Sequence, residues 1–271
     1  MLGYFRVYVQ ADAVWVEDVG EVGDATFQAL RKFLLYGTKA KMENCGESWG
    51  LLLVSGPKSA EAVAAAFGIE VRALQLLHTL PATIGGQQAL ILRTEETGEQ
   101  DFEVLLPADA VPAAWNQLMT SGAPFGIKPV GAQARELLRI EAGLPKAGPD
   151  LNEEIVPREA NLEGKAFSLS KGCYPGQEVV ARMDTYGNVR RHLVGLIIQD
   201  KTVPPAGSKL FSGDREVGWV SSAVFSPQRN AALAFGFPLR DFSAPDTTLT
   251  VEVAGTRHQA TVHALPFQKH S

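Results

Sequence analysis

One segment of this chain gathers side chains that could do chemistry, the residues Lys171-Gly-Cys-Tyr-Pro-Gly-Gln-Glu-Val-Val-Ala-Arg182. The preceding residues 166–170 alternate apolar and polar types, which predicts a half-buried strand. Residues 177–183 predict a short helix with Glu178 in its first turn, where a carboxylate suits the helix dipole. Glu178 and Arg182 are four residues apart and are expected to pair on one helix face. Cys173 is therefore predicted to lie in a turn that leads from a strand into a helix.

Cys173 is the candidate catalytic residue of the chain. A neighbouring ammonium, here that of Lys171, and a helix N-terminus both favour the nucleophilic thiolate over the thiol. A structural interpretation stands beside this one, because free cysteine is among the most buried residue types and often packs as a small hydrophobe. The glycines and the proline of the segment are also common in turns without any chemical role. The local residues leave both interpretations open.

Glu141 is a second candidate site residue. Residues 130–142 predict a helix whose apolar stripe contains Ala134, Leu137 and Leu138, and Glu141 lies further along that stripe. A carboxylate in this position is expected to be partly buried, which is costly unless hydrogen bonds compensate it. Two interpretations stay open: Glu141 accepts hydrogen bonds from nearby protein groups, or it faces donor groups of a bound ligand.

Length and composition exclude several classes of protein. The 271 residues predict about two domains. The net charge of −5 argues against extensive coating of nucleic acid, although a local basic patch remains compatible with it. The chain has no apolar run near the ~18 residues that a membrane span needs, so no membrane association is expected. The two cysteines, Cys45 and Cys173, are too few for a conventional iron–sulfur centre and predict no disulfide framework, which suits a reducing, cytoplasmic location. The five histidines lack metal-ligand spacing, so no metal site is expected.

Hydrophobic patterns divide the first half of the chain into strands and helices. Hairpins are predicted over residues 3–10 with 14–19, 40–44 with 50–54, and 88–94 with 101–106. Helices are predicted over residues 24–36, 55–66, 108–119 and 130–142. Repeated ββα units of this kind predict an α+β fold with helices packed on antiparallel sheets.

The second half has a different pattern. Short strand-like runs are predicted over residues 192–198, 209–211, 216–222, 231–235, 248–253 and 258–264. Proline and glycine turns separate these runs, which together predict a small antiparallel β-barrel at the C-terminus. The expected domains are residues 1–187, with subdomains 1–80 and 81–187 as a further division, and residues 188–271.

A proline-rich loop and a change of charge separate the predicted 130–142 helix from the barrel. Residues 143–164 form a long loop of the kind that often lines a cleft. Residues 136–163 hold three Lys or Arg against seven Asp or Glu, whereas residues 164–192 hold five against two. Such opposite strips often form self-complementary surface. The basic strip coincides with the cysteine segment and also suits an anionic ligand tail or a phosphate backbone.

Several of these segments resemble the YgfZ-type folate-binding proteins. They are Arg139-Ile-Glu-Ala-Gly-Leu-Pro145, Pro157-Arg-Glu-Ala160, Lys171-Gly-Cys-Tyr-Pro-Gly-Gln-Glu178 and Val217-Gly-Trp-Val-Ser-Ser-Ala-Val-Phe-Ser-Pro227. YgfZ-type proteins are relatives of the glycine-cleavage T-protein, an aminomethyltransferase, and are linked to iron–sulfur cluster maintenance and tRNA modification. The resemblance runs from the first hairpin to Phe267, and the cysteine segment is its most branch-specific part.

The resemblance implies a tetrahydrofolate-binding region followed by a barrel. Glu141 matches the carboxylate that faces the pterin ring, in a central cavity with Cys173 near its mouth. The implied cofactor-binding residues are Glu141, Lys171, Tyr174, Gly176, Gln177, Glu178 and Arg182. The implied partners are folate, iron–sulfur proteins or their assembly factors, and tRNA.

Family members usually begin with a further strand and helix, and then a segment that supplies a catalytic aspartate in the T-protein. This chain begins at the hairpin around residues 4–19, and Asp12, Asp18 and Asp24 lie in no matching motif. We therefore expect a folate-binding factor of iron–sulfur maintenance rather than a transferase. The alternative is a folate-dependent aminomethyltransferase that works with a lipoyl-bearing partner.

Overall fold

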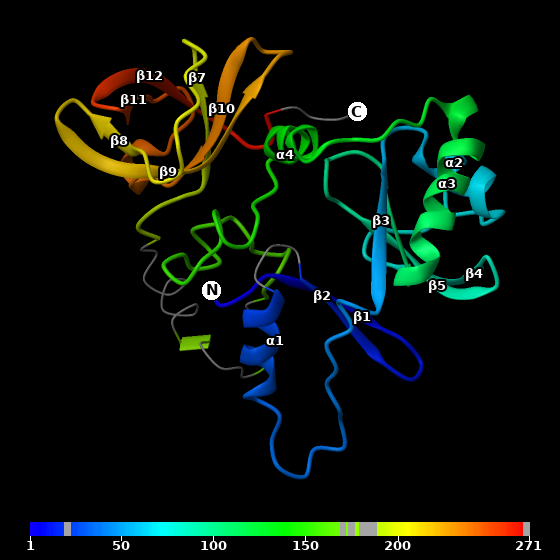
Figure 1. Ribbon diagram of the computed structural model, residues 1–271. Helices are drawn as coiled ribbons and strands as arrows, with labels where there is room; N and C mark the ends of the chain where they lie inside the picture. Colours follow the sequence, from blue (N-terminus) through cyan, green and yellow to red (C-terminus); the bar gives the residue numbers. More distant parts are fainter. Residues whose placement is uncertain (19–22, 169–171, 173–176, 179–188, 268–271) are drawn as a thin grey trace.

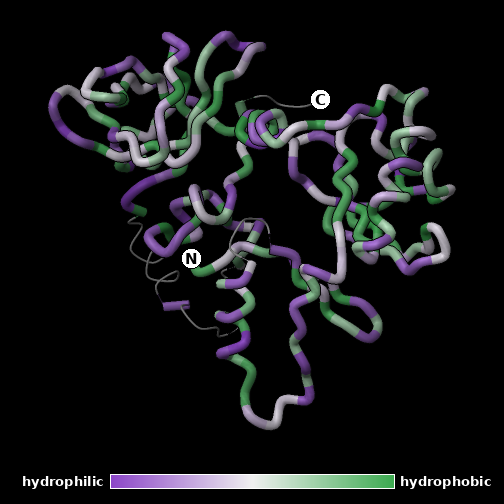
Figure 2. The backbone as a smooth tube through the Cα atoms, in the orientation of Figure 1, coloured by the Kyte–Doolittle hydropathy of each residue, from purple (hydrophilic) through white to green (hydrophobic). Residues whose placement is uncertain are grey.

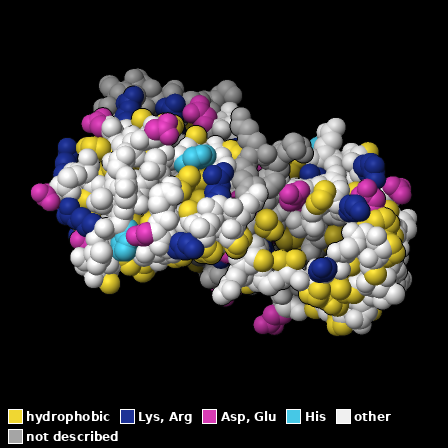
Figure 3. Space-filling model, turned by 90° about the horizontal axis from the view of Figure 1, so that it is seen from above, with side chains coloured by type: hydrophobic (Ala, Val, Ile, Leu, Met, Phe, Trp, Pro, Cys, Tyr) yellow, Lys and Arg dark blue, Asp and Glu magenta, His cyan; other side chains and the backbone are white. Residues whose placement is uncertain are grey.

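The computed structural model describes residues 1–18, 23–168, 172, 177–178 and 189–267. Figure 1 shows a helical and sheet-containing lobe on the right, a β-barrel at the upper left, and helix α4 (Ala132–Glu141) between them. Seen from above, the molecule narrows to a waist between these two lobes (Figure 3). In the part of the chain that is described, no helix has the length and apolar character needed to cross a membrane.

The first lobe is built on a four-stranded antiparallel sheet. Its spatial order is β3 (Trp49–Ser55), β6 (Asp101–Pro107), β5 (Gln87–Thr94) and β4 (Thr79–Ile84). Helices α2 (Ser59–Phe67) and α3 (Val111–Ser121) pack on one face of this sheet through small and branched residues such as Val63 and Leu118. Short 3₁₀ turns at Ala108–Ala110 and Ala123–Phe125 flank α3.

A two-stranded hairpin covers the opposite face of the sheet. It consists of β1 (Phe5–Val9) and β2 (Val14–Asp18), and helix α1 (Gly23–Arg31) comes next among the described elements. Side chains alternate along both strands, so Tyr8 and Trp15 point inward and pack with Leu90 and Leu92 of the sheet. The outward face carries four exposed valines, Val7, Val9, Val14 and Val16.

The second lobe is a closed six-stranded antiparallel barrel. Around the barrel the strands are β10 (Ala231–Gly236), β7 (Val194–Ile198), β12 (Thr256–His263), β11 (Thr248–Val253), β8 (Lys209–Ser212) and β9 (Arg215–Ser226). A third 3₁₀ turn, Arg240–Phe242, lies between β10 and β11. The hydropathy colouring of Figure 2 shows apolar residues recurring along these strands and polar residues at the turns. Closure leaves no free sheet edge in this lobe, which protects it from edge-to-edge association.

The fold class predicted from the sequence is confirmed: a mixed α/β region precedes a closed antiparallel barrel. All six barrel strands form close to the predicted positions, as do the first hairpin and the strands of the hairpin over residues 88–106. The predicted domain boundary at residues 187 and 188 falls outside the described residues and stays a prediction, as does a division at residue 80. Strand β4 contains residue 80, and the sheet to which β4 belongs also contains β3, which precedes residue 80 in the chain.

Two predictions of local structure were wrong, and a third fails over the part of it that is described. The helix expected over residues 24–36 ends at Arg31, where hydrogen bonds of the 3₁₀ type close its last turn, and residues 33–36 are exposed. Residues 40–44 form no strand, because the partner of β3 is the distant β6. Of the strand expected over residues 166–170, the described part makes only one isolated bridge, between Phe167 and Glu163.

Strand β4 was missed because Pro81 argues against a strand in the sequence. Pro81 cannot donate a hydrogen bond, which is tolerated at a sheet edge. Among the described strands β4 pairs only with β5, so it occupies such an edge.

Candidate functional site

Glu141 ends helix α4 at the point where this helix meets the barrel. Its residue is only 5% exposed, and its Oε1 accepts a hydrogen bond of 2.8 Å from the Ser226 hydroxyl of β9. The Ser226 oxygen in turn accepts a hydrogen bond from the Arg229 amide at 3.3 Å. Within the described residues this is the one hydrogen bond that the Glu141 carboxylate accepts. A carboxylate has about four acceptor positions, so this one keeps capacity for further donors.

The chain closes tightly around this helix end. Gly143 has a left-handed backbone with φ of +74°, and a Cβ atom there would meet Leu265 and Pro266 at 3.1 Å. Glycine is therefore required both by the turn and by the close approach of the C-terminal segment. In that segment the Phe267 amide donates to the Glu141 carbonyl at 3.0 Å. The prediction that Glu141 is buried is confirmed, and its carboxylate lies between α4 and the barrel.

Asp150 is the centre of a second polar contact between α4 and the barrel. This carboxylate is fully buried, and its Oδ2 accepts hydrogen bonds from the Arg139 guanidinium at 2.8 Å and the Lys146 amide at 3.0 Å. Its Oδ1 accepts from the hydroxyls of Ser221 at 2.6 Å and Ser222 at 2.7 Å. Both oxygens are thus satisfied, as a buried carboxylate requires.

Consecutive strand residues normally face opposite sides of a sheet, but Ser221 and Ser222 both reach Asp150. The explanation is a bulge in β9. Ser222 pairs with Phe235 and Val220 pairs with Gly236, so Ser221 is an extra residue without a partner in this register. A bulge of this kind re-aims a side chain, and here it turns both hydroxyls toward one carboxylate.

Arg139 completes this contact from α4. Its guanidinium pairs with Glu136 and Asp150 and lies over the Phe235 ring at 5.4 Å. Burial by itself would lower the pKa of Arg139, but the Glu136 hydrogen bond and the charge of Asp150 outweigh burial and raise the pKa. The guanidinium therefore stays charged between the two carboxylates.

The residues predicted from the cysteine segment fall mostly outside the described residues. Cys173, Lys171, Tyr174, Gly176 and Arg182 all do, so the proposed thiol site and the Glu178–Arg182 pair stay predictions. Gln177 is half-buried and Glu178 is exposed, both in helical conformation. The described residues therefore do not bring the cysteine segment to Glu141.

Part of the basic strip has a structural role. The Arg191 guanidinium lies 4.7 Å from the centre of the Trp219 ring and donates to the carbonyls of Val217 and Phe237, both at 3.4 Å. Trp219 stacks on Phe237 in turn, with 5.6 Å between ring centres. Arg191 therefore stabilises the packing of the barrel in addition to contributing positive charge.

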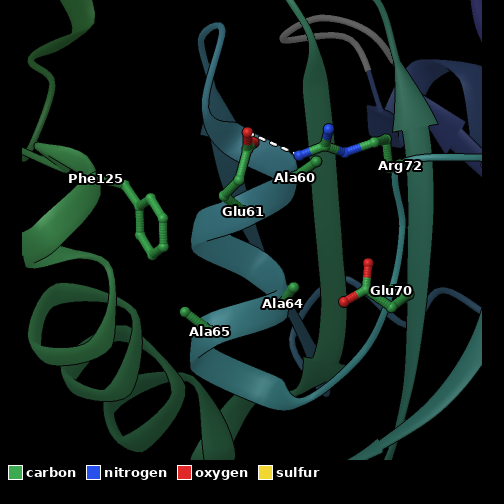
Figure 4. A pocket seen from close by; sticks show the side chains of 7 residues that line it. All are labelled: Ala60, Glu61, Ala64, Ala65, Glu70, Arg72 and Phe125. Carbon is green, nitrogen blue, oxygen red and sulfur yellow. Dashed lines mark ion pairs between the residues drawn. The ribbon is translucent and has the colours of Figure 1, made fainter.

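Two cavities lie on the α2–α3 layer, away from Glu141. One, of about 360 Å³, is lined by alanines of α2 together with Glu70, Phe125 and the Glu61–Arg72 ion pair of 2.8 Å (Figure 4). The other, of about 220 Å³, lies beside Asp109 and Gln117. Neither cavity is lined by Glu141.

Sequence reasoning missed Arg139, Asp150 and the three serines of β9. Asp150 lay in a loop with ordinary turn residues, and nothing there marked it as buried. The adjacent Ser221 and Ser222 within an apolar strand were the available signal, because two polar residues in succession break strand alternation.

Comparison with known proteins agrees with this architecture. Residues 7–169 match the family model of the GCVT N-terminal domain, and residues 191–269 match the glycine cleavage T-protein C-terminal barrel domain. An aminomethyltransferase of Saccharopolyspora erythraea is 33% identical over 234 residues, which are 85% of this chain and 63% of that protein. One of Chlorobium luteolum is 29% identical over 232 residues, with the same two shares of 85% and 63%.

A solved structure supports the same relationship. The crystal structure of the glycine cleavage system aminomethyltransferase T from Bartonella henselae superimposes with a TM-score of 0.85 at 26% identity. The match covers 99% of this chain and 73% of that one, whereas this chain spans less than two thirds of the curated relatives named above. With both domain models matched in order over most of its length, the chain belongs to the glycine cleavage T-protein family.

Proposed function

We propose that this protein binds tetrahydrofolate and that the Glu141 carboxylate receives the pterin ring. The observation that carries this proposal is a buried carboxylate at the junction of α4 and the barrel, for which the described part of the chain supplies one donor, Ser226. A pterin edge offers a ring N–H and an adjacent amino group, which suit a carboxylate with free acceptor positions. The family relationship supports the same ligand.

Replacement of Glu141 by glutamine is expected to weaken tetrahydrofolate binding. The amide has one acceptor oxygen and sets an NH₂ group against the pterin donors, so about 1.5–3 kcal/mol should be lost, roughly 10- to 150-fold in Kd. Titration calorimetry on both proteins, with thermal unfolding to verify folding, measures this change. Glu216→Gln, at an exposed barrel residue that pairs with Lys209, is the matched control and should bind as the unchanged protein does. Equal affinity of the Glu141→Gln protein would refute the assignment.

The finer proposal is that the folate-bound protein maintains iron–sulfur proteins through Cys173. Its support is the resemblance of residues 171–178 to the cysteine segment of YgfZ-type proteins. The partners on this proposal are iron–sulfur proteins or their assembly factors. A further proposed partner is tRNA, which some of these factors help to modify. Binding of tRNA phosphates by Lys171, Arg182, Arg190 and Arg191 would weaken strongly with added salt.

Cys173→Ser is expected to abolish rescue of an iron–sulfur enzyme defect while tetrahydrofolate affinity stays unchanged. A hydroxyl has nearly the size of a thiol but is not a comparable nucleophile, so the substitution removes reactivity and little else. Enzyme activity in a cell that lacks its own maintenance factor provides the measurement. Cys45→Ser is the control and should rescue fully. Full rescue by the Cys173→Ser protein would make that thiol structural.

The second candidate function is aminomethyl transfer. It is favoured by the relatives, since those compared above are named aminomethyltransferases. A glycine-cleavage assay with purified partner proteins, including the lipoyl-bearing carrier, distinguishes the two candidates. Turnover above background would establish the transferase, and its absence alongside tetrahydrofolate binding would favour the maintenance factor.

A further inference from the structure

The hairpin β1–β2 is attached to the four-stranded sheet by its inner face. Tyr8 and Trp15 pack there with Leu90, Leu92 and Leu105. Trp15 also meets Trp49 of β3 edge to face, with 5.0 Å between ring centres. Because the outer valines are exposed, the inner face carries the attachment among the described contacts.

Buried and half-buried charged residues lie within this attachment. Arg6 of β1 lies 3.3 Å from Glu17 of β2 and 3.7 Å from Glu103 of β6, and it also pairs with Glu96. Arg135 of α4 pairs with Glu96 at 2.7 Å. The network therefore joins the hairpin, the sheet and the helix that carries Glu141.

The network has one carboxylate more than it has guanidiniums. Among the described residues, Glu17, Glu96 and Glu103 pair with two cations, Arg6 and the more exposed Arg135. The other titratable groups nearby are Tyr4, Tyr8, the exposed Glu95, and Asp101, whose oxygens accept from the Glu96 and Thr97 amides and the Thr97 hydroxyl. None of them supplies a further positive charge. With all carboxyl groups ionised, the buried cluster would keep an uncompensated negative charge, which is costly.

The excess negative charge of the network is concentrated at Glu103. Its residue is 2% exposed, and its Oε2 has no hydrogen-bond partner among the described residues. Its Oε1 and the Glu17 Oε2 approach the same Arg6 nitrogen, Nη1, at 3.7 and 3.3 Å, and a hydrogen bond between the two carboxyl groups is one cause of the raised pKa of Glu103. Two carboxylates cannot donate to each other, so such a bond requires a proton on one of them.

We propose that Glu103 keeps its proton at neutral pH and donates it to the Glu17 carboxylate, and that this hydrogen bond latches the hairpin onto the sheet. With the proton present, three carboxyl groups carry two negative charges against two guanidiniums. The hydroxyl of Tyr8 donates to Glu17 at 3.0 Å and helps to fix the pair. Loss of the proton sets the buried Glu103 carboxylate against the half-buried Glu17 carboxylate and weakens the latch.

The acid–base properties of the cluster agree with this latch. Burial, and after it the charge of Glu17, raise the pKa of Glu103 to about 9. Burial and Glu17 also raise the pKa of Tyr8, which keeps its donor proton. A carboxyl whose pKa is raised in the folded state stabilises that state fully below its unfolded pKa and loses this contribution as pH rises through the folded pKa. The stabilisation that this proton gives the attached hairpin is therefore lost progressively as pH rises toward about 9.

The Trp15–Trp49 contact reports the position of the hairpin. Circular dichroism and fluorescence of this pair, followed from pH 6 to about 10, should lose the signal of the contact as pH rises toward and past about 9. Trp15→Phe identifies the signal. Glu103→Gln and Glu17→Gln should each keep it up to about pH 10, because an amide is neutral and still donates to the remaining carboxylate. Tyrosine ionisation sets the upper limit of the titration.

Glu61→Gln is the matched control, because it neutralises a more exposed Glu–Arg pair in the same lobe. It should show the same transition as the unchanged protein. The proposal is overturned if the unchanged protein keeps the tryptophan signal through pH 10. It is also overturned if the glutamine variants lose that signal at the same pH as the unchanged protein. Should Glu103→Gln not fold, Glu17→Gln decides the question, since either substitution restores charge balance. No ligand enters this experiment, so its result is independent of tetrahydrofolate binding.

Discussion

Replacement of Asp150 by alanine is expected to lower the free energy of unfolding by about 3–5 kcal/mol. Asp150 is fully buried and accepts from Arg139, the Lys146 amide, Ser221 and Ser222. Its removal leaves a buried guanidinium that only Glu136 and the Leu144 carbonyl still satisfy, and two buried hydroxyls without their acceptor. Breaking a buried ion pair by removing one partner costs more than the pair contributes, because the remaining buried groups lose partners that water cannot replace.

Denaturant unfolding followed at Trp219 measures this loss in the barrel lobe. Asp150→Asn keeps an acceptor oxygen and should cost less than alanine does. Combining Asp150→Ala with Arg139→Met should recover part of the loss, since no buried charge is then left unpaired. A change below about 1 kcal/mol for Asp150→Ala would show that the pair does not hold α4 to the barrel.

Replacement of Phe235 by alanine is also expected to lower the free energy of unfolding by about 3–5 kcal/mol. Every residue of β10 is buried, because Ala232 and Ala234 face the barrel interior while Leu233 and Phe235 face the junction with α4. Phe235 has no exposed surface there and packs in one cluster with Ile140 and Phe237. Alanine would remove the ring beneath Arg139 and leave a cavity at the junction.

Phe235→Leu is the control for this prediction. Leucine keeps much of the apolar volume and should cost less than about 1.5 kcal/mol. Equal losses for the alanine and leucine variants would point to a specific aromatic contact with Arg139 instead of buried volume. The two variants are compared by their denaturation midpoints under identical conditions.

Strands and helices with clear local patterns were predictable without the structure. The first hairpin and the barrel strands alternate, and turn residues separate them, so their positions follow from local sequence. The stripe on α4 likewise predicted that Glu141 is buried. These features depend on neighbours in the chain, which a single sequence contains.

Strand partners and buried charges were not predictable in this way. The partner of β3 is β6, and the intervening residues contain α2, β4 and β5. Glu103 alternates with apolar residues along β6, as a solvent-facing residue would, yet the hairpin covers that face. The sequence contains no local sign of such a cover.

The sequence by itself determined most of the strands and helices, that a barrel follows an α/β region, and that Glu141 is buried. Only the tertiary structure decided what surrounds each carboxylate: Ser226 at Glu141, two serines turned by a bulge toward Asp150, and Glu17 beside Glu103. The physical reason is that local pattern depends on residues close in the chain. The environment of a buried charge depends on elements brought together from 71 to 86 residues away, such as Ser221 with Asp150, or Glu103 with Glu17.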